Sequence, residues 1–323
     1  MPEKDKVSLR ETGIQALFPL FLILVSLVLH FYLPNQQLVK LNSLYSIILL
    51  GLVALIICSY SLGFFYTVIR TKLVYYVPLV SVGIIALTLW ELLSLKFNIL
   101  PLPFFPSPDK VLDAFSNDYG VIALSILYSL RLLFVGYFLG VLLGIPTGIA
   151  MGWYKKFNYW INPLLKFVGP VPSTAWIPLV LVIFPTSFTA SIFLIALATW
   201  FPVTVMTWSG VAGVSNSYFE VAKTLGADER YLITKVALPA ALPLVFIGLF
   251  MGLGVSFVTL IVAEMLGVKA GLGWYIQWAM GWGEYYKVYA ALIVMSVMFS
   301  LIISLLFKFR DKLLVWQKGV IKW

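Results

Sequence analysis

The sequence predicts an all-α polytopic membrane protein, and two features of its composition lead to this prediction. Hydrophobic residues make up 62% of the 323-residue chain and charged residues only 11%, with a mean hydropathy of +1.00. Soluble domains carry about 25% charged residues, so a single water-soluble core is excluded. The apolar residues also form long runs, and a helix is the simplest structure that satisfies every backbone polar group of such a run inside a bilayer.

The apolar runs give the order of the expected helices. A membrane-spanning helix needs about 20 mostly apolar residues, each adding about 1.5 Å. The candidate spans are 14–33, 44–69, 75–95, 121–152, 174–184, 188–212, 242–265 and 287–307. Residues 1–13 are too charged to span, and no small-residue cleavage site follows the first run, which is therefore expected to be an uncleaved helix.

Two runs do not have the length of a simple span. Run 174–184 is too short to cross alone, and the prolines in and around it are Pro170, Pro172, Pro178 and Pro185. This pattern predicts a broken or re-entrant element, which is stable in a bilayer only when it is buried in protein or lines a cavity. Run 121–152 is too long for one perpendicular crossing, so we expect its first turns, with Arg131, to lie in the outer interface or the helix to tilt steeply.

Lysines and arginines in the short connections predict the orientation. With the N-terminus inside, the inner connections hold Lys4, Lys6, Arg10, Arg70, Lys72, Lys155, Lys156, Lys166, Lys223, Arg230, Lys235, Lys308, Arg310, Lys312, Lys318 and Lys322. The outer connections hold only Lys40, Lys96, Lys110, Lys269 and Lys287. This bias places both termini and segment 213–240 in the cytoplasm. The net charge of +9 then reflects topology in a lipid bilayer, and nucleic acid is excluded as a partner.

The chain lacks the residues for several kinds of catalytic or metal site. It has one cysteine, Cys58, and one histidine, His30, so a disulfide framework, a histidine-based zinc site and a catalytic triad are not expected. We expect Cys58 to pack in the membrane and His30 to lie at the interface.

Small residues recur along the fourth run. The positions are Gly136, Gly140, Gly144, Gly148 and Gly152. Spacing of this kind forms a ridge on which another helix can pack closely, and we favour packing over a gating role.

Segment 217–239 is unusually polar for this chain. Ser217 and Glu220 have capping-box spacing, which predicts that a helix begins there. Gly226 can adopt the left-handed conformation that ends a helix. A second helix is expected to begin at Ala227 or Asp228 and to end before Pro239, because proline disfavours helical geometry in the preceding residue. The segment could be a solvated loop, but this order of cap, glycine and proline favours a rigid docking element for a soluble partner.

The same segment resembles a known motif. The order Glu220, Ala222, Gly226, Val236, Leu238 and Pro239 is similar to the EAA motif of permease subunits in binding-protein-dependent ABC importers, with valine at positions 221 and 236. In that family the motif forms the coupling helix that docks on the cytoplasmic ATPase. The resemblance implies that the ATPase-docking residues are Glu220, Ala222, Gly226, Asp228, Glu229, Arg230, Leu238 and Pro239.

The resemblance covers about residues 75–307. Segments 102–108, 169–178 and 263–274 are similar to the nitrate/sulfonate/taurine branch of these importers. It implies a six-span permease core at 75–323, with coupling helices at 217–239 and a basic C-terminal tail. Residues 1–74 are then an N-terminal extension with two further transmembrane helices, which has no counterpart in the usual short members.

The family resemblance also implies a function and partners. The chain would be the permease subunit of an ATP-driven importer in a bacterial plasma (inner) membrane, moving a small oxyanion, sulfonate or similar solute. A second permease copy, an external binding protein and cytoplasmic ATPases would be its partners. The chain contains no G-x-x-x-x-G-K-[ST] phosphate loop, so it is expected to need no cofactor, with ATP and Mg bound by the separate ATPase.

Candidate pathway residues lie within or next to the spans. Ionisable side chains in a membrane are costly and indicate function by default; here they are Glu91, Arg131 and Glu264. Arg131 could snorkel, pair with a carboxylate or contact an anionic ligand. Glu264 is expected to stabilise a gate or helix packing. Irregular backbone often faces a pathway, so the residues expected to line it on the broken element are Ser173, Thr174 and Trp176.

Two other functional classes were weighed. An ion-gradient-driven secondary transporter would carry carboxylates and broken helices near the midplane, often in two inverted repeats. The sequence contains one broken element without a matching half. A membrane-embedded enzyme would need a cluster of nucleophile, base and metal ligands, and the sequence does not suggest one.

Overall fold

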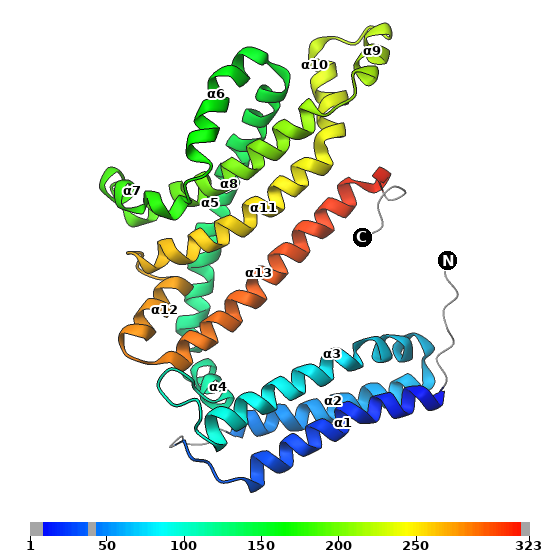
Figure 1. Cartoon of the computed structure of the whole chain (residues 1–323), viewed down its shortest axis with the longest axis vertical. Coiled ribbons are helices and arrows are strands. Elements are labelled where there is room, and N and C mark those ends of the chain that lie inside the picture. The colour runs from blue at the N-terminus through cyan, green and yellow to red at the C-terminus, as the bar shows by residue number, and fades with distance from the viewer. Residues whose placement is uncertain (1–8, 38–42, 318–323) are drawn as a thin grey trace. The chain divides into compact units, whose positions relative to one another are not determined.

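The computed structural model describes residues 9–37 and 43–317, and this part of the chain forms helices and no strands (Figure 1). The predicted all-α class is therefore confirmed. Several residues that predicted the orientation lie outside the described residues, namely Lys4, Lys6, Lys40, Lys318 and Lys322, as do the side chains of Arg10 and Arg70.

Helices occupy the predicted apolar runs. Their bounds are α1 Leu9–Tyr32, α2 Ser43–Phe65, α3 Thr67–Glu91, α5 Tyr119–Trp153, α8 Ser187–Ala212, α11 Leu238–Met265 and α13 Tyr285–Leu313. In the described part of the chain, six helical stretches are long and apolar enough to cross a membrane. The apolar stretch Leu17–Tyr32 of α1 is shorter. A multi-pass membrane protein follows from these lengths and compositions.

The predicted break at the fifth run is present. Helix α6, Lys155–Val168, is followed by the 3₁₀ turn Ser173–Trp176 and helix α7, Ile177–Ile183. The two parts meet at 86°, and together they count as a seventh, broken span. Pro170 and Pro172 lie in the break, where each lacks the N–H that a continuing helix would need.

The chain divides into two compact units. One contains Met1–Tyr119 with Ala279–Ala290, and the other contains Gly120–Trp278 with Ala291–Trp323. The first unit holds α1, α2, α3 and the short helix α4, Pro108–Asn117. These units do not follow the predicted boundary between residues 74 and 75, which stays a prediction about the family core.

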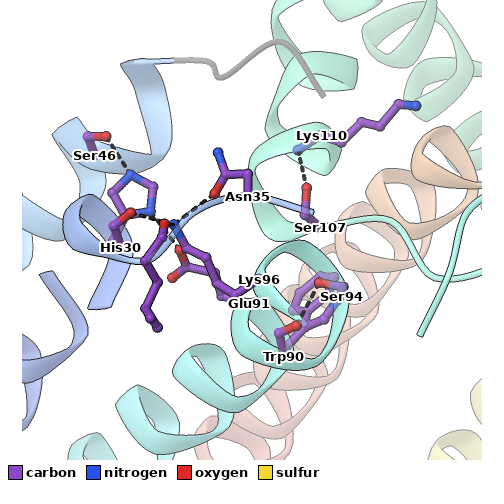
Figure 2. A network of polar contacts seen from close by, with 10 residues as sticks. His30, Asn35, Ser46, Trp90, Glu91, Ser94, Lys96, Ser107 and Lys110 are labelled. Carbon is purple, nitrogen blue, oxygen red and sulfur yellow. Dashed lines mark hydrogen bonds and ion pairs between the residues drawn. The ribbon is translucent and has the colours of Figure 1, made fainter. Parts of the chain in front are cut away.

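Helices α1, α2 and α3 of the first unit share an apolar core and a buried polar network. The core comprises Ile23, Tyr45, Leu49 and Ile84. Figure 2 shows His30 of α1 between Glu91 of α3 and Ser46 of α2, with Nδ1 2.6 Å from the glutamate Oε1 and Nε2 3.0 Å from the serine Oγ. Because only 6% of His30 and 2% of Glu91 are exposed, the expected interfacial position of His30 is wrong.

A lysine closes the same network. Lys96 ends the single π-helical turn Leu92–Lys96 that follows α3. Its ammonium donates to the Leu33 carbonyl at 2.9 Å and to Asn35 Oδ1 at 2.8 Å (Figure 2). Lysines are almost never fully buried without partners, and these acceptors lie just after α1. The network therefore holds the end of α1 against the end of α3.

The glycines of α5 form the predicted packing ridge in the second unit. A Cβ atom added at Gly136 would lie 2.7 Å from Cβ of Ile195, and one at Gly148 would lie 2.5 Å from Cβ of Thr207. Residues of α8 face each glycine of the ridge in the same way. Close backbone approach between α5 and α8 therefore depends on the absence of side chains at these positions, as predicted.

Candidate functional site

The polar segment between α8 and α11 is helical nearly throughout. Helix α9 is Asn216–Thr224, and α10 is the single turn Glu229–Tyr231. A π-helical turn, Leu232–Ala237, leads from α10 into α11 without a break. We call residues 215–239 the coupling segment.

The start of α9 differs from the predicted capping box. The N-cap is Ser215, whose side chain makes no capping hydrogen bond and lies 2.8 Å from the hydroxyl of Ser217. The helix thus begins two residues earlier in register than the box requires. Glu220 lies in the second turn, where it cannot reach back to the Ser217 amide, and its side chain is exposed.

The predicted glycine turn is confirmed. Gly226 has φ of +85°, in the left-handed region, and its N–H donates to the Lys223 carbonyl at 2.9 Å. The Ala227 N–H reaches back to the Ala222 carbonyl at 3.0 Å. Asp228 then caps α10, because its Oδ1 accepts from the Tyr231 N–H at 2.9 Å. A helix, a glycine turn and a second capped helix follow one another here.

The predicted end of the second helix before Pro239 is wrong. The backbone stays helical through Pro239 into α11, and the Leu238 N–H donates to the Ile233 carbonyl, five residues back. Proline cannot donate to the carbonyl four residues before it and its ring crowds that carbonyl. The π turn widens the helix just before Pro239 and absorbs this conflict. Segment Glu229–Met265 is consequently one continuous helical stretch.

One face of the coupling segment is anchored to the end of α5. The rings of Phe219 and Trp153 meet edge to face with centroids 5.4 Å apart. The Trp153 Nε1–H donates to Glu229 Oε1 at 2.8 Å. Phe219 also packs against the buried cluster that contains Val211 and Ala237. Glu229, predicted to dock a partner, therefore also binds within the chain.

The opposite face carries exposed apolar side chains. Tyr218 is 63% exposed, Val221 61% and Leu225 83%, and Tyr231 of α10 is also exposed. The first three have the spacing i, i+3 and i+7 of one helix face. Sequence analysis missed this face because it followed the charged residues, although the spacing would have predicted it. Its ATPase-docking role, and that of Glu220, Ala222, Arg230 and Leu238, stays a prediction.

The predicted pathway residues of the broken element are mostly engaged in packing. The Ser173 hydroxyl is buried and lies 2.7 Å from Oγ1 of Thr259 on α11. Trp176 packs on the cluster that contains Ile177 and Val180, and its buried Nε1 has no hydrogen-bond partner among the described residues. Thr174 is half-buried. Lining of a pathway by these residues stays a prediction.

Glu264 is the centre of a buried polar cluster. Its side chain is 1% exposed, and both carboxylate oxygens accept from the Ser129 hydroxyl, at 2.7 and 2.9 Å. Oε2 also accepts from the Gly273 N–H at 2.8 Å, while the Leu272 N–H donates to Ser129 Oγ at 2.9 Å. The cluster joins α5, α11 and the start of α12, Leu272–Gly281. This geometry fits the expected packing role, and Ser129 is a member that sequence analysis missed.

Arg131 lies apart from Glu264 in its contacts. The Arg131 guanidinium stacks over the Phe188 ring, 5.0 Å from its centroid, and its side chain is exposed. It forms no ion pair with a carboxylate in the described part of the chain. The suggested pairing of Arg131 with a carboxylate is therefore wrong.

Comparison with known families identifies the core. Residues 136–314 match the family described as the binding-protein-dependent transport system inner membrane component. The chain belongs to this family. The match begins at the first glycine of the α5 ridge and contains the coupling segment, the Glu264 end of α11 and nearly all of α13, so the membrane helices described above are those of a family permease.

Named relatives agree with the predicted branch of this permease family. An ABC transporter permease protein of Methanocaldococcus jannaschii is 31% identical over 175 residues, covering 52% of this chain and 65% of the relative. The taurine transport system permease protein TauC of Escherichia coli is 33% identical, covering 52% and 64%. The bicarbonate transport system permease protein CmpB of Synechococcus elongatus is 34% identical, covering 35% and 41%. The chain matches less than two thirds of each relative's length.

A solved permease structure shares the fold. A chain of the MetNI methionine ABC transporter aligns with a TM-score of 0.52 at 19% identity, over 61% of this chain and 97% of that chain. The all-α permease fold is thereby confirmed for this family member.

Proposed function

We propose that this chain is the membrane-spanning permease subunit of an ATP-driven importer. A soluble binding protein delivers a small oxyanion, sulfonate or similar solute at the outer face, and two permease copies form the pathway. Separate ATPases bind at the cytoplasmic face and hydrolyse ATP. The relatives named for taurine and bicarbonate support a small anionic solute.

The observation that carries this proposal is the two-sided coupling segment. Its inner face is held by Phe219 and Glu229 against Trp153, and its outer face presents Tyr218, Val221 and others to solvent. Exposed apolar side chains on a polar, capped protrusion are typical of a protein-binding surface. The ATPase groove covers this outer face, while the anchored face passes displacement to α5 and α11.

Transport proceeds by alternating access. The ATPases shift the equilibrium between inward-open and outward-open states because they bind the coupling segments differently in the two states. The residues that we assign to the pathway or its gate are Ser173, Thr174, Trp176, Arg131 and Glu264. Their role is to position helices and line a route, since transport makes and breaks no covalent bond in the solute.

The docking face predicts the effect of a paired substitution. Val221→Ser with Leu225→Ser removes apolar surface that lies outside the fold, so we expect unchanged folding but at least a tenfold loss of co-purifying ATPase, because burial of two such side chains contributes about 1.5–3 kcal/mol each. The measurement is the amount of the co-expressed ATPase retained by the tagged permease.

A matched control separates docking from general loss of apolar surface. Val315→Ser changes a side chain of similar exposure, 58%, beyond the end of α13. It should retain the wild-type amount of ATPase. Equal retention by all three proteins would contradict docking on this face, and uptake driven by an ion gradient in ATP-free vesicles would instead support a secondary transporter.

A further inference from the structure

A cavity of about 440 Å³ opens at the predicted outer end of the second unit. Three elements line it: α5, the first turn of α8 and the connection between α11 and α12. Two of its lining residues are cations, Arg131 and Lys269, and none is a carboxylate. The coupling segment lies at the other ends of α8 and α11, so this cavity is separate from the proposed docking face.

The cavity carries unbalanced positive charge. Neither Arg131 nor Lys269 forms a hydrogen bond or ion pair with the residues that the structure describes. The guanidinium is nevertheless positioned, because it stacks on Phe188 at 5.0 Å from the ring centroid. A cation held beside apolar walls without a counter-charge favours the binding of an anion.

Neutral groups of the cavity also suit an anion. Ser187 begins α8, whose first backbone N–H groups have no partners within the helix and carry partial positive charge. Gly267 has φ of +138°, and a Cβ atom there would lie 3.1 Å from the Ser187 hydroxyl oxygen. This close approach brings the loop that carries Lys269 against the start of α8. Cations, N–H groups and a hydroxyl therefore converge from separate elements.

The depth of the cavity indicates where the anion comes from. Arg131 precedes Trp153 by 22 residues in the same helix, a rise of about 33 Å, close to the thickness of a bilayer's hydrocarbon core. If Trp153 lies at the cytoplasmic interface, Arg131 lies at the level of the outer headgroups. Phospholipid phosphates occupy this level, and basic pockets between membrane helices bind anionic headgroups.

We propose that this cavity is a binding site for a phosphate-type oxyanion, supplied by an anionic phospholipid headgroup or by the free anion. Arg131 and Lys269 neutralise its charge, and the first turn of α8 donates hydrogen bonds to its oxygens. The apolar walls, which include Leu132 and Val268, cover the glycerol side of a lipid.

The test uses the full chain in nanodiscs of phosphatidylcholine with or without phosphatidylglycerol, and inorganic phosphate as the soluble probe. Wild-type protein should retain phosphatidylglycerol in native mass spectra. Arg131→Gln with Lys269→Gln should weaken retention on the order of tenfold, since each charge-assisted contact is worth more than a neutral one. Arg131→Lys with Lys269→Arg keeps both charges and should stay within a few-fold of wild type.

The matched control removes two exposed lysines of α6, Lys155→Gln with Lys166→Gln. It should retain phosphatidylglycerol as wild type does; an equal loss in both double variants would overturn the site in favour of general surface charge. Saturable inorganic phosphate binding that the cavity variant loses identifies a free-anion site, and retention of phosphatidylglycerol alone identifies a lipid site. Absence of both in wild type overturns the proposal. None of these measurements involves the ATPase, so they are independent of importer function.

Discussion

At the scale of single residues, Glu264 shows how one carboxylate can hold three segments together. Its oxygens accept from Ser129 and from the Gly273 N–H. Gly271 comes so close that a Cβ atom there would lie 2.5 Å from the carboxylate carbon, and its φ is +144°. Glycine at 271 is therefore required for space as well as for backbone conformation.

Removing this carboxylate should destabilise the protein. In Glu264→Ala the Ser129 hydroxyl and the Gly273 N–H lose a buried acceptor, which costs about 1–3 kcal/mol for each group left unsatisfied. Denaturant unfolding of the full chain in detergent measures the loss. Glu220→Ala removes an exposed carboxylate and should leave the free energy of unfolding within about 0.5 kcal/mol of wild type. Similar values for both variants would contradict the assigned role of Glu264.

At the scale of elements, helix positions could be predicted from the sequence but their local geometry only in part. Apolar runs and prolines predicted the spans and the break after α6, because bilayer thickness and the missing proline N–H act on short stretches. The capping box at Ser217 and the stop at Pro239 failed. Each depended on contacts made elsewhere: Phe219 packs in the α11 core, and a π turn accommodates the proline.

The turn at Gly226 gives a test of backbone conformation alone. No atom lies within 4 Å of a Cβ added there, so only the φ of +85° opposes a side chain. Gly226→Val should strain the turn by about 1–2 kcal/mol and lower ATP-driven uptake by the assembled complex, whereas Gly226→Asn should be tolerated, because asparagine visits this conformation. Uptake assays in proteoliposomes compare the two; equal uptake would show that the turn's conformation does not matter for coupling.

The glycine ridge gives a test of helix packing. Gly148→Leu places a side chain where Thr207 already lies, and overpacking of this kind typically costs about 1–3 kcal/mol. Gly254→Leu is the control, because nothing lies within 4 Å of a Cβ atom at that position of α11. Thermal unfolding should fall only for the first variant. A comparable fall for both would point to insertion rather than packing.

At the scale of the whole molecule, the sequence indicated a family core and an extension, but it gave no sign of what joins α1 and α2 to α3. His30, Ser46, Glu91 and Lys96 are separated by up to 66 positions along the chain and have no shared spacing. Only the packed helices bring them together. Their burial indicates that α1 and α2 provide partners for charges that α3 and its π turn carry.

Truncation tests this dependence. Deleting residues 1–66 removes His30, Asn35 and Ser46, and breaking a buried ion pair typically costs about 3–5 kcal/mol. We expect a low yield of monodisperse protein in size-exclusion chromatography. Adding Glu91→Leu and Lys96→Leu to the truncated chain should restore much of that yield, because no unpaired charge would remain. A truncated chain that behaves like the full one would contradict the expectation.

Helix α5 contacts the coupling segment through Trp153 and the Glu264 cluster through Ser129. These contacts are 24 residues, about 36 Å, apart on one helix. The glycine ridge leaves no slack against α8 between them. The pair therefore works as a stiff lever: a tilt of about 5° about one contact carries the other through about 3 Å, more than a hydrogen bond can stretch without breaking.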